Sequence, residues 1–383
     1  MRKKISTILI SVITLLLLAA VFMPRHYSRA IRYGYVNIDD YKIFENREVK
    51  NDQPIPWQKD SMYNIQKISA EHSLVFDTFG TTAFVVIRDK KLIHEEYWDG
   101  ATDTTRSNSF SAAKSIISLL IGSLLDEGKI KSLEQPVTDF LPGFKNSNGF
   151  TLRIKDLLTM SSGLDWDEGY SSLFSPTTEA YYGSNLANQM LDLKVVTEPG
   201  IKFEYQSCDT QLLGMIVGSA SGKSVSEYAS EKLWKPLGAE HPALWSLDRK
   251  DGIEKAYCCF NSTARDFARI GQMVLDSGQF NNRQIVSQSY ILQATSPALY
   301  LTGEDNKPCY YYGYHFWILN HKGHKVAYAR GILGQYIFII PDLNAVVVRL
   351  GTIRSKEYRN HSPKDVFTYL DAAFELLGET KTL

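Results

Sequence analysis

Apolar runs separated by short polar turns occur near both ends of the chain, and this pattern predicts β-strands there. Residues 82–100 contain two apolar runs on either side of Asp89-Lys90-Lys91, as expected for a β-hairpin on one side of a sheet. Near the C-terminus four more segments predict strands, YGYHFWILN, KVAYARG, QYIFIIP and NAVVVRLG, and Asp365 to Leu377 predicts a closing helix. We therefore expect one sheet completed by segments from the two ends of the chain.

The middle of the chain has a helical pattern instead. After Ser111, apolar residues cover more than one helix face, which predicts a helix enclosed on most sides, through Ile116, Ile117, Leu119, Leu120, Ile121, Leu124 and Leu125. Helical, turn-rich sequence continues from residue 151 to about residue 294. The predicted fold class is α/β (α+β): an antiparallel sheet formed by N- and C-terminal segments, flanked by helices, with an inserted, mainly helical half.

The first residues predict an export signal. Arg2, Lys3 and Lys4 precede an uncharged run of 19 residues from Ile5 to Met23. The run is long enough to cross a hydrocarbon core and ends in bulky residues, which favours an uncleaved anchor over a cleaved signal peptide. The short N-terminus favours a cytoplasmic start, although three arginines beyond the run weaken the charge contrast, Arg25, Arg29 and Arg32.

Three segments are therefore predicted: a signal anchor or signal peptide over residues 1–24, a polar connector over 25–75 and one domain over 76–383. We expect the domain to lie outside the cytoplasm, in the periplasm or at the cell surface. Residues 5–23 are expected to attach it to the cytoplasmic membrane.

Composition narrows the classes of partner and cofactor. The 383 residues include 42 basic and 42 acidic residues, so no net charge attracts a phosphate backbone and no nucleic-acid partner is expected. The sequence contains no P-loop, no G-x-S-x-G and no histidine pair with metal-ligand spacing, so no metal or nucleotide cofactor is implied. The four cysteines lack C-x-x-C spacing. Adjacency hinders a bond between Cys258 and Cys259, so we expect buried or free thiols, with a bridge from this pair to Cys208 or Cys309 as the alternative.

Ser111-Ala112-Ala113-Lys114 is the only S-x-x-K tetrapeptide in the chain, and it opens the predicted buried helix. Residues three apart share a helix face, so the Lys114 amine can reach the Ser111 hydroxyl, while the helix N-terminus favours negative charge there. The alternative is a polar helix start with an exposed lysine. Because Lys114 enters an apolar segment, where it needs a partner and its pKa is lowered, we identify Ser111 as the candidate nucleophile.

The segment Phe110 to Ser115 resembles the active-site helix of the serine β-lactamase and penicillin-binding protein superfamily, in particular the branch with class C β-lactamases, D-aminopeptidases, esterases and 6-aminohexanoate-dimer hydrolases. Residues 151–164, TLRIKDLLTMSSGL, and residues 263–271, TARDFARIG, are similar to that branch's T-x-x-x-L-L-x-x-x-S-G-L and A-x-D-x-A-x-x-G stretches. The resemblance covers about residues 80 to 378. It implies a β-lactamase/transpeptidase-like fold.

The resemblance also implies a Y-x-N element, whose counterpart here is Tyr205-Gln206-Ser207. Tyr205 would act as general base and then acid, and its phenol, with an ordinary pKa near about 10, would need Lys114 close by to favour the phenolate. The alternative is a buried tyrosine whose hydroxyl finds a partner. Ser207 replaces an asparagine that in relatives binds the lysine and the substrate amide, which speaks against β-lactam turnover. Two other candidates are set aside by their position, Tyr35-Val36-Asn37 and Tyr182-Gly183-Ser184.

The K-T-G element of β-lactamases is absent, and Ala329-Arg330-Gly331 stands at its position. The resemblance implies that Gly331 lets substrate lie against the strand edge and that the backbone N–H groups of Ser111 and Ile332 form an oxyanion hole. Arg330 either clamps a substrate carboxylate or lies in solvent at the sheet edge. His321-Lys322-Gly323 is predicted to be a hairpin turn.

These residues together predict a serine hydrolase that forms an acyl-enzyme, with Ser111, Lys114 and Tyr205 as its catalytic set. Substrate would meet Ser207, Arg330, Gly331 and Tyr170. Other aromatic segments either line this cleft or pack in the core, among them Tyr181, Tyr182, and residues 310–314 with Trp317.

The motif combination looks most like the 6-aminohexanoate-dimer hydrolase and carboxylesterase branch, so small amides or esters are the expected substrates. A D-amino-acid peptidase or a β-lactamase is the second expectation. From another functional class, the alternative is a non-catalytic, membrane-anchored penicillin or peptidoglycan receptor, which the Ser-Lys-Tyr set argues against.

Overall fold

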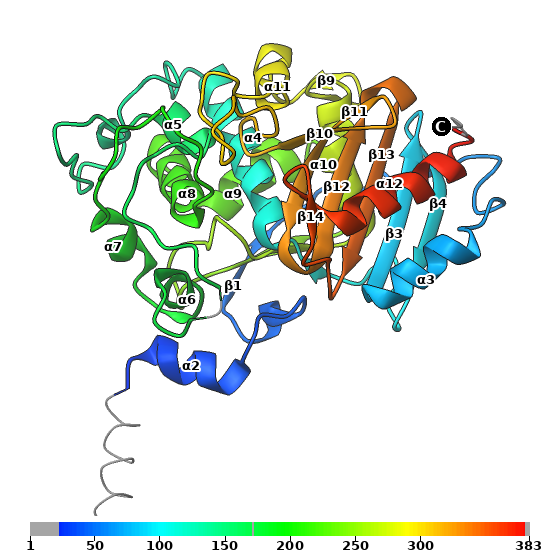
Figure 1. The fold of residues 1–383 in the computed structure, drawn as a ribbon, viewed down its shortest axis with the longest axis horizontal. Helices are drawn as coiled ribbons and strands as arrows, with labels where there is room; N and C mark the ends of the chain where they lie inside the picture. The colour runs from blue at the N-terminus through cyan, green and yellow to red at the C-terminus, as the bar shows by residue number, and fades with distance from the viewer. Residues whose placement is uncertain (1–22, 171, 380–383) are drawn as a thin grey trace, which may run out of the picture.

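The computed structural model describes residues 23–170 and 172–379, and a seven-stranded sheet forms one half of it (Figure 1). Neighbouring strands are antiparallel except for the short edge strand β2, which runs parallel to β4. In spatial order the strands are β10 (Trp317–His321), β11 (His324–Gly331), β12 (Gln335–Ile340), β13 (Ala345–Gly351), β3 (Thr81–Arg88), β4 (Lys91–Tyr97) and β2 (Gln58–Lys59). The predicted sheet, completed by segments from both ends of the chain, is therefore confirmed.

Helices cover both faces of this sheet, which explains why its strands are apolar on both sides. Helix α10 (Ala264–Leu275) lies on one face, while α12 (Lys364–Leu376) and α3 (Ala70–Thr78) lie on the other, in front of the sheet in Figure 1. Alternate residues of β3 point to opposite faces: Val85 packs in the core with α10, and Phe84 packs in the core with α12. The predicted closing helix is α12, beginning one residue earlier than expected.

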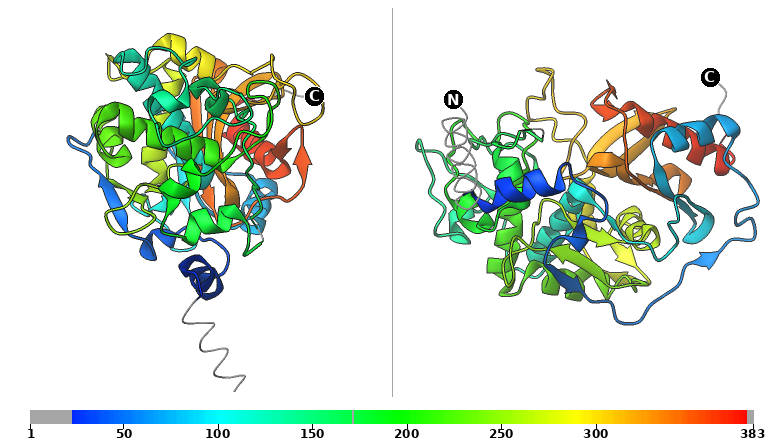
Figure 2. Two further views of the ribbon diagram at one scale, coloured as in Figure 1. Left: turned by 90° about the vertical axis from the view of Figure 1, so that its left-hand side faces the viewer. Right: turned by 90° about the horizontal axis from the view of Figure 1, so that it is seen from below.

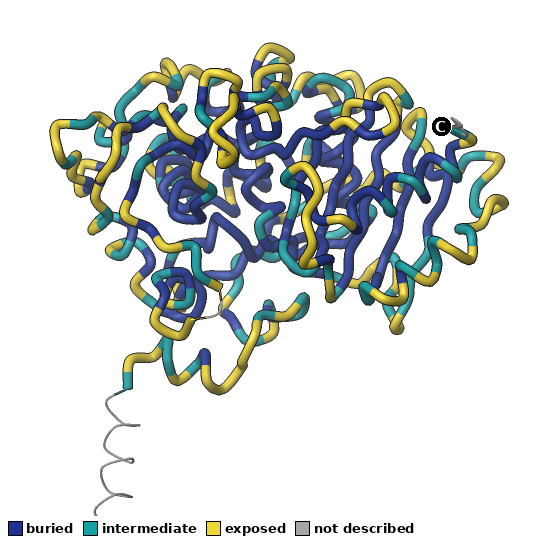
Figure 3. The backbone as a smooth tube through the Cα atoms, viewed as in Figure 1, coloured by how far each residue is buried: buried dark blue, intermediate teal, exposed yellow. Residues whose placement is uncertain are grey.

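The other half of the molecule is mainly helical, as predicted (Figure 2). Its central helix, α4 (Ala113–Asp126), is buried from Ala113 to Leu124, which confirms a helix enclosed on most sides (Figure 3). The surrounding helices are α5 (Ile154–Leu158), α6 (Pro176–Tyr182), α7 (Leu186–Leu191), α8 (Ser207–Ser221), α9 (Val225–Ala229), a π-helical turn over Ser230–Trp234, and α11 (Gln288–Ala294).

A second sheet of four short strands was not predicted. Its order is β1-β6-β7-β5, with β1 (Asn46–Val49), β6 (Ala243–Ser246), β7 (Phe260–Ser262) and β5 (Ser107–Asn108). These strands have two to four residues, too few for a period-two pattern to be recognised. The sheet joins segments far apart in the sequence and leads from β5 directly to Ser111.

The segment 25–75, predicted as a connector, contributes structure of its own. It forms helix α2 (Arg25–Tyr33), strand β1 of the second sheet, edge strand β2 and the start of α3. Helix α2 packs beside α6, below the helical half in Figure 1. The remaining short strands are two hairpins, β8 (Gln279–Phe280) with β9 (Arg283–Gln284), and β14 (Tyr358–Arg359) with β15 (Ser362–Pro363).

The predicted membrane segment, residues 5–23, lies outside the described residues except for Met23. Within residues 23–170 and 172–379, no helix has the length and apolar character needed to cross a membrane.

Candidate active site

Ser111 lies where the second sheet passes into the central helix. It belongs to a 3-10 turn, Phe110–Ala112, that continues directly into α4, so it stands at the N-terminal end of the buried helix as predicted. The preceding residue, Phe110, has a positive φ of 44°, and its backbone N–H donates to Asn108 Oδ1 at 2.9 Å. Such a backbone conformation is costly for a residue with a side chain and is held here by its neighbours. The turn leaves Ser111 half-buried, lining two cavities of about 320 and 540 Å³.

Lys114 is buried one helical turn beyond Ser111. Only 1% of it is exposed, and its Nζ donates to Ser207 Oγ at 3.1 Å and to the Tyr257 carbonyl at 2.9 Å. Burial lowers the pKa of Lys114 to about 8, because desolvation penalises the ammonium more than nearby Glu168 stabilises it. A sizeable fraction of the amine is therefore neutral near pH 8, as a proton acceptor must be.

Tyr205 comes from the segment before α8 and lines the larger cavity together with Ser111. Burial, followed by the charge of Glu168, raises the pKa of its phenol well above the usual value, although nearby Ser111 opposes this. The Lys114 ammonium faces the Tyr205 ring, 5.4 Å from its centroid. The raised pKa favours the protonated phenol, a form suited to donating a proton, and the general-base role expected for Tyr205 stays a prediction.

Glu168 is part of the site, although no motif in the sequence pointed to it. Its carboxylate accepts hydrogen bonds from Ser207 Oγ at 2.5 Å, the Ser207 N–H at 2.7 Å and Trp166 Nε1 at 2.7 Å, and also from the Tyr170 hydroxyl. Ser207 thus links the Lys114 amine to the Glu168 carboxylate. Serine at this position keeps the hydrogen bond to the lysine, and its hydroxyl has no donor left for a substrate amide.

The predicted oxyanion donors face the same space, since Ser111 and Ile332 both line the two cavities. Gly331, immediately before Ile332, is needed for a reason other than the expected one: a Cβ there would lie 2.2 Å from the Ser109 carbonyl oxygen. Because Gly331 has no side chain, the end of β11 can lie against the turn Phe110–Ala112. This contact places Ile332 beside Ser111.

Arg330 matches neither alternative fully. Its guanidinium stacks 3.2 Å from the centroid of the Trp317 ring, donates to the His361 carbonyl at 2.7 Å and lines the larger cavity.

Tyr170 is 40% exposed and lines both cavities. Of the other aromatic residues, Tyr181 and Tyr182 line the smaller cavity, whereas Tyr311 and Tyr312 pack in the core. The His321-Lys322-Gly323 segment is the predicted turn, between β10 and β11.

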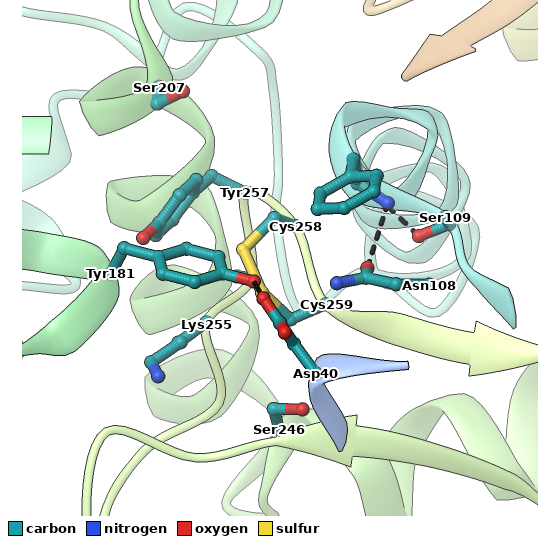
Figure 4. Close-up of a disulfide and its surroundings, with 12 residues drawn as sticks. Asp40, Asn108, Ser109, Tyr181, Ser207, Ser246, Lys255, Tyr257, Cys258 and Cys259 are labelled. Atoms are coloured by element: carbon teal, nitrogen blue, oxygen red, sulfur yellow. Dashed lines mark hydrogen bonds between the residues drawn. A yellow bond between two sulfur atoms is a disulfide. The ribbon is translucent and has the colours of Figure 1, made fainter. Parts of the chain in front are cut away.

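The cysteines differ from the expectation. Cys258 and Cys259 form a disulfide with each other (Figure 4). Cys208 and Cys309 are buried free thiols. A bond between neighbours becomes accessible because Cys259 adopts a positive φ of 64°, a backbone conformation that the sequence did not reveal. Cys258 lines the smaller cavity directly after Tyr257, whose carbonyl accepts from Lys114. The disulfide therefore stiffens one wall of the site.

Thiol counting tests this pairing. In the native protein, neither free thiol is expected to react with an aromatic disulfide reagent, because both are buried. In denaturant, two equivalents of reagent should react, and after reduction of the disulfide this number should rise to four. The Cys208→Ala, Cys309→Ala double variant provides the control, with none in denaturant before reduction. Four reactive thiols in unreduced, denatured protein would contradict the disulfide.

A serine at the start of a buried helix, a buried lysine one turn later and a tyrosine from the segment before a second helix, set beside an antiparallel sheet, are typical of serine hydrolases with a β-lactamase-like fold. The family model described as Beta-lactamase matches residues 75–379. The chain belongs to this family and is a serine hydrolase.

Similar proteins come from several branches of the family. The 6-aminohexanoate-dimer hydrolase of Paenarthrobacter ureafaciens is 28% identical over 71% of this chain and 72% of its own length. A solved structure from Bacillus anthracis, named as a 6-aminohexanoate-dimer hydrolase, superposes with a TM-score of 0.78 at 23% identity, covering 92% of this chain and 95% of that chain. A family VIII carboxylesterase structure gives 0.61 at 16% identity, over 81% and 99%. The two structures share the fold of this chain.

Proposed function

We propose that this protein hydrolyses small esters or amides through an acyl-enzyme formed on Ser111. The observation that carries the proposal is the position of Ser111: it lines two cavities, shares the larger one with Tyr205 and lies one helical turn before a buried lysine of lowered pKa. The names of the relatives, a 6-aminohexanoate-dimer hydrolase and a carboxylesterase, support an amide or ester substrate.

In the proposed reaction, Ser111 Oγ attacks the substrate carbonyl carbon while the neutral Lys114 amine takes its proton. The N–H groups of Ser111 and Ile332 stabilise the oxyanion. Tyr205 donates its proton to the leaving group as the scissile bond breaks, and protonated Lys114 restores the phenol. Water then attacks the acyl-serine, giving up a proton as Ser111 regains one, and the carboxylic acid departs.

Turnover of 4-nitrophenyl acetate by the full chain, compared with Ser111→Ala, tests this function. Turnover by the wild type that is lost in the variant, with a stable fold in both, supports the hydrolase. If Ser111 becomes acylated and the adduct never hydrolyses, the receptor alternative is correct instead. Absence of any Ser111-dependent acylation would refute the proposal.

The extracytoplasmic location, with residues 5–23 as anchor, is also part of the proposal. It is supported by the uncharged run in the sequence. Accessibility of the domain to protease added outside intact or wall-stripped cells tests it, with fragmentation expected and complete protection contradicting it.

The pH dependence should report the Lys114 amine. Because its neutral form accepts the proton and its pKa is about 8, kcat/KM for a neutral ester is expected to rise with pH through about 8 and then level off. The neutral amine accumulates above its pKa, and the lowering of that pKa brings the active form into the range near pH 8. If kcat/KM is constant from about pH 6.5 to 9.5, or falls through pH 8, a group other than Lys114 is the base.

A further inference from the structure

Two cavities with different linings meet at Ser111. The larger one is lined by charged side chains of both signs, Glu168, Glu304, Arg330 and Arg354. The described residues that line the smaller one include no charged side chain; its walls come from Ala, Gly, Val, Leu, Ile, Phe, Tyr, Ser, Thr and Cys. Ser111, Tyr170 and Ile332 line both, so a substrate bonded to Ser111 extends into each.

One wall of the smaller cavity comes from outside the family match, which begins at residue 75. Ala30 of α2 and the following Gly34, Tyr35 and Val36 line the cavity. The Tyr182 hydroxyl donates to the Gly34 carbonyl at 2.9 Å, which fastens this segment to α6. The segment 30–36 therefore closes one side of the smaller cavity.

The charges behind these walls do not favour a cation. Asp40, a buried acid behind this wall, already accepts a hydrogen bond from the Tyr181 hydroxyl at 2.6 Å (Figure 4), and the Glu168 carboxylate already accepts from Ser207 and Tyr170. Lys255 lies on the same side, with its Nζ 5.4 Å from the centroid of the Tyr181 ring, but burial lowers its pKa well below the usual value, so it is not a fixed positive charge. Helix α2 adds Arg29, whose guanidinium donates to the Ile43 carbonyl at 2.7 Å. An ammonium in the smaller cavity would lose its water and would meet no carboxylate among the described residues that line it.

The position of Tyr205 decides which part of the substrate enters which cavity. Tyr205 lines the larger cavity only, and the leaving group must accept its proton. The leaving group therefore occupies the larger cavity. The acyl group, on the opposite side of the Ser111 bond, extends into the smaller, uncharged one.

We propose that the smaller cavity, closed by residues 30–36, is an acyl-chain site that selects uncharged, apolar acyl groups and rejects acyl chains ending in an ammonium. This inference rests on the proposed acyl-enzyme function and names its substrate class. The preferred acyl group would then differ from the one in the name of a relative, the 6-aminohexanoate-dimer hydrolase, because a 6-aminohexanoyl group carries a terminal ammonium.

A matched pair of substrates tests the proposal: 4-nitrophenyl heptanoate and 4-nitrophenyl 6-aminohexanoate differ only in a terminal CH₃ or NH₃⁺. With the full chain, kcat/KM is expected to favour the heptanoate by about 100-fold. Val36→Glu, which places a carboxylate in the wall, is expected to reduce this preference by at least about 10-fold. Ile31→Glu adds the same charge at an exposed site on α2 that does not line the cavity, and should leave the preference unchanged.

A reference substrate, 4-nitrophenyl acetate, shows whether the proposed function or only the acyl-site inference fails. If 4-nitrophenyl acetate shows no Ser111-dependent turnover, the proposed function fails and the acyl-site inference with it. If acetate is turned over but the heptanoate is not preferred, the acyl-site inference alone is overturned. It is also overturned if Val36→Glu and Ile31→Glu change the preference equally, and thermal unfolding of both variants checks that each is folded.

Discussion

Replacing Lys114 with methionine is expected to lower kcat/KM for 4-nitrophenyl esters by about 1,000-fold or more, because the variant removes the group proposed to take the Ser111 proton. Methionine fills most of the same volume in a site where the side chain is 1% exposed. It also removes a buried ammonium, whose desolvation is what lowers the lysine pKa to about 8. We therefore expect the loss of activity with a melting temperature close to that of the wild type.

Lys91→Met serves as the matched control, since that lysine is at a strand end and exposed. It should leave kcat/KM unchanged. Steady-state kinetics and thermal unfolding on the same preparations separate the two effects. Activity of Lys114→Met within about 10-fold of the wild type would show that another group takes the proton.

Arg349→Met is expected to lower the free energy of unfolding by about 3 kcal/mol and kcat by about 10-fold. Arg349 lies on β13, is fully buried, and forms no ion pair within residues 23–170 and 172–379. Its guanidinium instead holds backbone carbonyls together: Leu333 at 3.0 Å, Gly334 at 2.8 Å, Ile353 at 3.2 Å and Phe79 at 2.5 Å. Methionine would leave the buried Gly334 carbonyl and the three part-buried carbonyls without this donor.

Arg349 is a positioning residue, because Leu333 and Gly334 directly follow Ile332 and set the direction of its N–H. Urea unfolding gives the stability, and kcat per site titrated with a fluorophosphonate gives the activity of folded protein alone. Arg349→Lys keeps the charge but not the planar fork, so an intermediate loss is expected in both measurements. A loss of stability with unchanged kcat per titrated site would leave Arg349 with a structural role only.

The large sheet was predictable because its strands are long and buried on both faces. Strand β3 is buried from Thr81 to Ile87, so its sequence is a continuous apolar run, and the same holds for β12 and β13. The second sheet was not predictable, because β1 and β5 to β7 have only two to four residues and pair across long distances in sequence. Helix α2 has a single buried residue, Ala30, so its sequence is indistinguishable from a polar connector.

In the site too, residues in a local sequence motif could be predicted, whereas residues whose roles depend on contacts distant in sequence could not. Ser111 and Lys114 could be found because both the S-x-x-K spacing and the apolar helix behind it are local. Glu168 could not, because its role depends on Ser207 and Tyr170, brought together only by the fold. The Cys258–Cys259 bond depends on the backbone conformation of Cys259, and the protonation of Tyr205 depends on burial.

The most direct test of the account is the site of covalent labelling. The full chain, treated with a fluorophosphonate, digested and analysed by mass spectrometry, is expected to carry one adduct, on Ser111, with no adduct in Ser111→Ala. An adduct on another serine, or a well-folded wild-type protein that takes up no label, would contradict Ser111 as the nucleophile.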